Sequence, residues 1–88
     1  MTDIAIRTPN FPFAAPRLSS QREHLVRAGD RLWRLLDASG RILGHLRVVP
    51  DPLGLRYRAE RLVTATGSFR TVGEFWSADD AAAVLRNG

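Results

Sequence analysis

The run LRYRAERLV at positions 55–63 decides the fold, because apolar and charged side chains alternate along it. Side chains two residues apart in a strand point to the same face of a sheet. The alternation therefore places Arg56, Arg58 and Glu60 on one face and most of the apolar side chains on the other. Arg61 interrupts the apolar face, so we expect it near the edge of that face, with its aliphatic stem on the core and its charge in water.

Three further strands are expected around this one. The runs at 31–37 and 41–49 are joined by the short sequence ASG, which is typical of a β-hairpin. Two prolines and a glycine within 50–54 predict a turn, and a loop at 64–68 leads into a strand at 69–75. Val72 and Phe75 are three residues apart, and a bulge at Gly73 would bring both to the buried face.

The C-terminal sequence SADDAAAVLRNG predicts a helix of about ten residues. Ser77 is a suitable N-cap, Asp80 can complete a capping box with it, and Asp79 and Asp80 lie at the positive end of the helix dipole. Such a helix needs a sheet face on which to bury its apolar side chains.

Two different segments are expected before the first of these strands. Residues 1–18 contain Pro9, Pro12 and Pro16, which disfavour both helix and central strand, so we expect an arm that is either flexible or extended, with Phe11 and Phe13 packed on the domain or on a partner. Ser20 and Glu23 resemble a capping box and Gly29 suits a helix end, so a short helix is expected at about 20–28.

Together these elements predict an α+β fold, in which a four-stranded antiparallel β-meander packs on one C-terminal helix within a single domain at 19–88. The other face of an antiparallel sheet can remain in water. The expected core consists of Trp33, Leu35, Ile42, Leu46, Val48, Leu55, Tyr57, Ala59, Phe69, Val72, Phe75, Val84 and Leu85.

The composition excludes several classes of site. The 88-residue chain has no cysteine, so it contains no disulfide and no cysteine-ligated metal. His24 and His45 do not have a metal-binding spacing, the serines fall at turns or caps, and the glycines form no phosphate-binding loop. We therefore expect no enzyme activity, no cofactor, no metal and no small-molecule substrate. No apolar run is long enough to cross a bilayer and the N-terminus lacks an export signal, so a cytoplasmic protein without membrane contact is expected.

The charge is carried by arginine alone: the chain has 13 arginines and no lysine against 9 acidic residues, a net charge of +4. Arg56 and Arg58 share one face of their strand, and we expect Arg34, Arg47 and Arg70 to align beside them across the sheet. Guanidinium groups bind phosphates and guanine, and a sheet can enter the major groove of DNA. Trp76 is expected either to pack under the helix start or to stay partly exposed, where it could stack on a ligand or join an interface.

Residues 55–86 resemble a known DNA-binding family through the stretches YRAER at 57–61 and VGEFWSADDAA at 72–82. These are similar to the end of the plant ethylene-response-factor DNA-binding domain and to the arm-type DNA-binding domains of phage and transposon integrases. The resemblance implies a three-stranded sheet followed by a helix, and double-stranded DNA as the partner. It further implies that Arg56, Arg58 and Arg70 contact bases or phosphates while Arg34 and Arg47 position the DNA backbone.

Two other interpretations of the arginine-rich face remain open. The face can be merely solvated, with its arginines paired to Asp37, Glu60 and Glu74. Alternatively, the open sheet face or an edge strand binds another protein or a second copy of this chain, as in an adaptor, an inhibitor or a small subunit.

Overall fold

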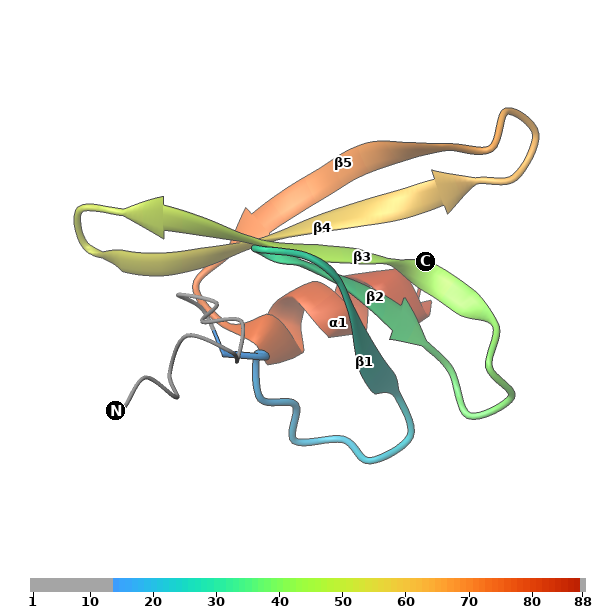
Figure 1. Ribbon diagram of the computed structural model, residues 1–88, viewed down its shortest axis with the longest axis horizontal. Helices are drawn as coiled ribbons and strands as arrows, with labels where there is room; N and C mark the ends of the chain where they lie inside the picture. Colours follow the sequence, from blue (N-terminus) through green and yellow to red (C-terminus); the bar gives the residue numbers. More distant parts are fainter. Residues whose placement is uncertain (1–13, 88) are drawn as a thin grey trace, which may run out of the picture.

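The computed structural model of the chain describes residues 14–87, which form one antiparallel sheet and one helix (Figure 1). The sheet is a meander with the strand order β1-β2-β3-β4-β5. The elements are β1 (His24–Gly29), β2 (Leu32–Leu36), β3 (Ile42–Asp51), β4 (Gly54–Val63), β5 (Ser68–Phe75) and α1 (Ala78–Asn87). The α+β class and the antiparallel meander are confirmed, but the sheet has five strands rather than four.

The additional strand is β1, which occupies the segment where a short helix was expected, so that prediction was wrong. The Oγ of Ser20 does accept a hydrogen bond at 3.1 Å from the backbone N of Arg22, but the chain then continues into β1 and not into a helix. A helix of about two turns is only marginally stable alone. Pairing of Leu25 with Leu35 instead satisfies the backbone edge that β2 would otherwise expose.

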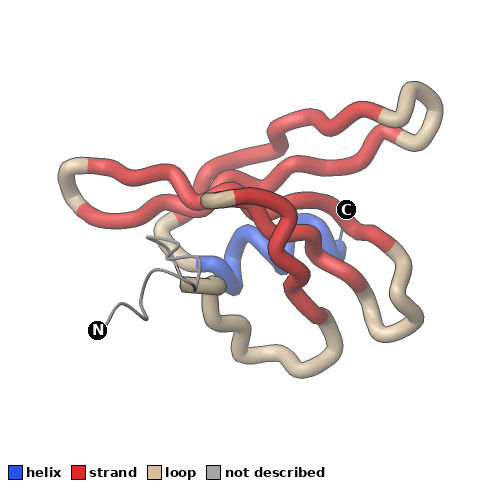
Figure 2. Tube along the Cα trace, viewed as in Figure 1, coloured by secondary structure: helices blue, strands red, loops and turns tan. Residues whose placement is uncertain are grey.

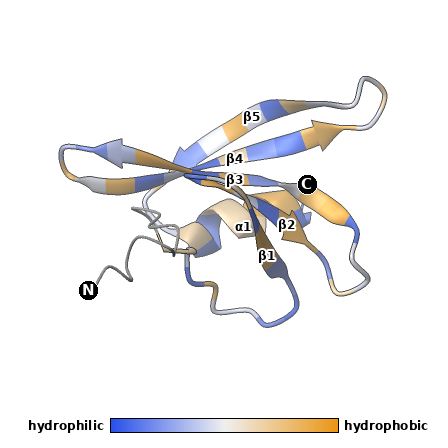
Figure 3. Ribbon diagram, viewed as in Figure 1, coloured by the Kyte–Doolittle hydropathy of each residue, from blue (hydrophilic) through white to orange (hydrophobic). Residues whose placement is uncertain are grey.

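Helix α1 lies against one face of the curved sheet, and we call this the covered face; the opposite one is the open face (Figure 2). Along β3, β4 and β5, hydrophilic and hydrophobic segments alternate, as expected of strands with one buried face (Figure 3). The core beneath α1 is formed by Leu35, Leu46, Ala59, Ala78, Ala81, Ala82 and Leu85. Small helix residues therefore let α1 approach the sheet closely.

A glycine in β3 makes this close approach possible. A Cβ atom on Gly44 would lie 2.3 Å from the backbone oxygen of Glu60 and 3.0 Å from a methyl carbon of Leu85. Both distances are shorter than ordinary van der Waals contact. The side chain of Leu85 thus occupies the space that any larger residue at position 44 would need.

Three of the expected core residues are exposed. Ile42 and Phe69 are each 36% exposed and Leu55 is 40% exposed. Ile42 is the first residue of β3 and Leu55 the second residue of β4, so both lie near strand ends. The ring of Phe69 instead stacks on the imidazole of His45, with centroids 3.8 Å apart.

The helix start matches its prediction, and the preceding segment is fastened to it. The backbone N of Asp80 donates to Ser77 Oγ at 3.1 Å, as expected of an N-cap. The carboxylate of Asp79 accepts hydrogen bonds from Ser19 N at 2.8 Å and from Ser19 Oγ at 2.6 Å. The prediction that Phe11 and Phe13 pack on the domain lies outside the described residues.

Candidate nucleic-acid interface

Strand register places four of the five predicted arginines on the open face. Directly paired residues share a face of the sheet. Arg34 pairs with His45, which pairs with Glu60; Arg47 pairs with Arg58, and Val49 with Arg56. The covered face is identified by the row of Trp33, Leu46 and Ala59. Arg34, Arg47, Arg56 and Arg58 therefore come together from three adjacent strands.

Arg70 does not join them, so its expected alignment with the other four was wrong. It pairs with Arg61, whose guanidinium reaches α1 on the covered face. The reason is a bulge: Ala59 pairs with Gly73 but Glu60 pairs with Thr71, so Val72 is an extra residue in β5. The bulge lies one position before Gly73. It brings Val72 and Phe75 against the core as expected, and it also reverses the faces of all earlier residues of β5.

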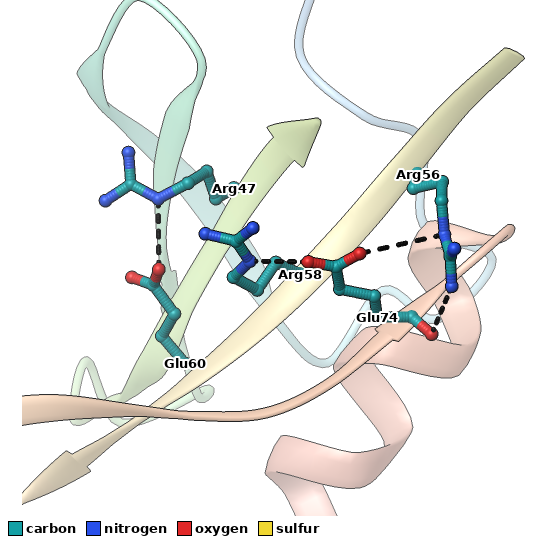
Figure 4. A network of polar contacts seen from close by, with 5 residues as sticks. All are labelled: Arg47, Arg56, Arg58, Glu60 and Glu74. Atoms are coloured by element: carbon teal, nitrogen blue, oxygen red, sulfur yellow. Dashed lines mark hydrogen bonds and ion pairs between the residues drawn. The ribbon is translucent and has the colours of Figure 1, made fainter. Parts of the chain in front are cut away.

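Two glutamates hold three of the open-face arginines (Figure 4). Arg47 Nε lies 3.0 Å from Glu60 Oε2, and Arg58 Nε lies 2.8 Å from Glu74 Oε2. Arg56 approaches the same Glu74, with its Nε 3.8 Å from Oε1 and its Nη2 donating to the backbone oxygen at 3.4 Å. Arg34 is exposed and makes no ion pair with the residues that the structure describes. Four arginines against two glutamates leave this face with an excess of positive charge.

A buried polar pair, which spacing along the chain does not reveal, lies within the open face. His45 is 9% exposed and Glu60 is 8% exposed, with Nδ1 of the histidine 3.7 Å from Oε1 of the glutamate. Burial lowers the pKa of His45 below its ordinary value; the nearby charges of Arg34 and Arg47 act in the same direction, while Glu60 opposes them. The imidazole is therefore held mainly neutral, and Glu60 is left to neutralise Arg47.

Trp76 lies at the rim of this face rather than under the helix start. Its side chain is 53% exposed, and the guanidinium carbon of Arg56 lies 4.8 Å from the ring centroid. This is cation–π geometry, which also leaves part of the ring accessible. Arg56 thus bridges Glu74 and the exposed indole.

The open face presents guanidinium groups that carry positive charge and hydrogen-bond donors. No group of three or more potential metal ligands occurs within residues 14–87. No helix in the same part of the chain is long and apolar enough to span a membrane. The fold and the open face define a small α+β protein with a basic sheet surface. No family model matches the sequence, and no curated protein or solved structure matches it either.

Proposed function

We propose that the protein is a non-catalytic, cytoplasmic module that binds double-stranded DNA through the open face of its sheet. One observation carries the proposal: Arg34, Arg47, Arg56 and Arg58 lie together on the face that α1 leaves uncovered. Three neighbouring strands contribute to this group. Strands of a sheet can enter the major groove, where guanidinium groups contact phosphates and the acceptor edge of guanine.

The arrangement of β3, β4, β5 and α1 supports the same proposal. An antiparallel three-stranded unit followed by a capped helix is what the family resemblance of residues 55–86 implies. In this chain β1 and β2 extend that unit on one side, and β2 adds Arg34 to the basic surface. At the other edge of the sheet, Trp76 directly follows β5 and is exposed.

The proposal is tested by duplex binding at two salt concentrations. If three or four arginines each neutralise a phosphate, affinity for a labelled duplex of about 20 base pairs falls roughly 40- to 150-fold between about 50 and 200 mM salt. Fluorescence anisotropy measures this affinity. Quenching of the exposed Trp76 provides a second signal, because Trp33 is only 1% exposed.

Two variants that remove the same charge from opposite faces sharpen the test. Arg34→Gln is expected to weaken duplex binding roughly three- to tenfold, because it removes one electrostatic contact. Arg70→Gln, on the covered face, is expected to change the affinity less than about twofold. The proposal fails if the two variants behave alike, or if binding does not respond to salt. Salt-insensitive self-association in place of DNA binding would favour a protein-interaction function for this face.

A further inference from the structure

A hollow lies where the turn between β1 and β2 faces β3. It has a volume of about 410 Å³, and its lining includes Asp30 and Arg31 of the turn, Arg47 and Val48 of β3, and Arg58 of β4. The turn is fixed to β3, because Val48 N donates to the backbone oxygen of Arg31 at 2.7 Å. The hollow is thus bounded by a turn on one side and by arginine side chains on the other.

Arg47 and Arg58 place two positive charges opposite each other, and each of them is paired with one glutamate. They are direct cross-strand partners on β3 and β4. Like charges directly opposite each other destabilise a sheet. Both side chains are partly desolvated, at 41% and 33% exposure, so water screens their repulsion incompletely. A bound anion would attract both guanidinium groups and so offset their mutual repulsion.

Each glutamate orients one of these guanidinium groups but bonds to only one of its nitrogens. Among the described residues, Arg47 hydrogen-bonds Glu60 through Nε, and Arg58 hydrogen-bonds Glu74 through Nε. The terminal nitrogens of both groups point away from their glutamates (Figure 4). Each arginine is therefore fixed at one nitrogen and keeps its terminal donors for a ligand.

We propose that Arg47 and Arg58 form a clamp that holds one phosphate group in this hollow. Two planar guanidinium groups from adjacent strands can donate several charge-assisted hydrogen bonds to the oxygens of one phosphate. The inference rests on the proposed DNA binding in one respect: the phosphate is then a backbone phosphodiester. The clamp positions the duplex, while Arg34 and Arg56 lie farther across the open face.

The first experiment uses the unmodified full chain and inorganic phosphate. NMR follows the arginine Nε–Hε signals during a phosphate titration in which chloride keeps the ionic strength constant. The signals of Arg47 and Arg58 are expected to shift along one common saturation curve. Arg41 is the internal control, because its side chain is 77% exposed in the β2–β3 turn. Equal shifts at all three arginines, or no shift beyond that caused by chloride, would overturn the clamp.

Asp30 provides a variant that strengthens binding rather than removing a contact. It is the acidic residue of the lining, and its charge opposes an anion in the hollow. Its backbone oxygen accepts from Arg27 at 2.9 Å, a bond that Asp30→Asn keeps. This variant is expected to tighten phosphate binding about two- to threefold. Weaker or unchanged binding counts against the clamp.

Duplex DNA separates failure of the clamp from failure of the proposed function. Arg47→Gln and Arg58→Gln are each expected to lower the salt slope of duplex binding by about one, whereas Arg70→Gln leaves it unchanged. Phosphate binding at the pair without any duplex binding supports the clamp, assigns it to a free phosphorylated molecule and overturns the DNA proposal. The clamp alone is overturned if the protein binds the duplex, the NMR signals of Arg47 and Arg58 do not shift with phosphate, and both variants keep the salt slope of the unmodified protein.

Discussion

On the covered face, Arg61 donates both terminal nitrogens to the last turn of α1, whereas on the open face Arg47 and Arg58 each hold a glutamate through Nε. Arg61 Nη2 lies 2.7 Å from the oxygen of Val84, and Nη1 lies 3.3 Å from that of Leu85. Carbonyl groups in the last turn of a helix lack partners within the helix, so this arginine acts as a C-terminal cap.

A second pair beside α1 follows the same pattern as Arg61. Arg86 donates from Nε and Nη2 to the two carboxylate oxygens of Glu23, at 2.9 and 3.0 Å. This pairing lowers the pKa of Glu23 and fastens the segment before β1 to the helix end. Arg61 and Arg86 use terminal nitrogens to bond to the protein, whereas Arg47 and Arg58 on the open face bond to their glutamates through Nε. The nitrogens that each guanidinium group uses therefore distinguish the arginines that fasten the helix from Arg47 and Arg58, a difference that net charge does not reveal.

The largest expected effect tests whether the covered face depends on close packing. Gly44→Ala is expected to lower the free energy of unfolding by about 3 kcal/mol, because the new methyl group meets the backbone oxygen of Glu60 and the side chain of Leu85. Urea denaturation followed by tryptophan fluorescence measures the change. Gly29→Ala is the matched control, since its Cβ would lie at an ordinary 3.5 Å from Leu32 Cβ, and its effect stays within about 0.5 kcal/mol. Equal effects in the two variants would show that β3 yields easily beneath the helix.

The second effect compares two arginines that face each other across β4 and β5. Arg61→Gln is expected to destabilise the fold by about 1–3 kcal/mol, because two helix carbonyl groups lose their donors. Arg70→Gln is the control and stays within about 0.5 kcal/mol, since it removes an exposed charge opposite another arginine. Thermal unfolding and duplex binding are measured on both proteins. Loss of DNA affinity in Arg61→Gln without loss of stability would contradict the distinction between the two faces.

The sequence predicted the elements whose signals are local. The alternation at 55–63 identified β4 with its charged face, and the cap at Ser77 identified the start of α1. The segment at 20–28 carried helix signals at Ser20 and Glu23. Its strand conformation comes from pairing with β2, which a local pattern does not encode.

The predicted face of a side chain was correct where alternation along one strand was sufficient, as for Arg56 and Arg58. Arg70 was misplaced because one extra residue, Val72, reverses the alternation along β5. The glutamate partners depend on register between strands: Arg47 and Glu60 are 13 residues apart, and Arg58 and Glu74 are 16 apart. That register follows from turn geometry and the bulge, so the pairs could not be identified from residue spacing alone.

The smallest effect concerns the buried histidine of the open face and appears as a pH dependence of stability. Because burial lowers the pKa of His45 in the folded protein, the unfolded chain binds a proton there more readily. The stabilisation from the neutral imidazole is complete above the unfolded pKa of about 6.5 and is lost as the pH falls below it. One proton sets a ceiling of about 1.4 kcal/mol per pH unit on this slope.

Urea titrations between about pH 7.5 and 5.5 measure the slope while remaining above the range in which Glu23 contributes, since its pKa lies below an ordinary glutamate value. His45→Gln is expected to flatten the stability profile in this range, and His24→Gln, at an exposed position of β1, is expected to retain it. The carboxylate of Glu60 already pairs with Arg47 through Oε2, so a proton on His45 would give Oε1 of the same carboxylate a second cationic partner and weaken its hold on Arg47. Acidification should therefore broaden the Nε–Hε signal of Arg47 before that of Arg58, whose partner is Glu74. Simultaneous broadening of both signals would show that the two arginines are held by the sheet as a whole rather than by their separate glutamates.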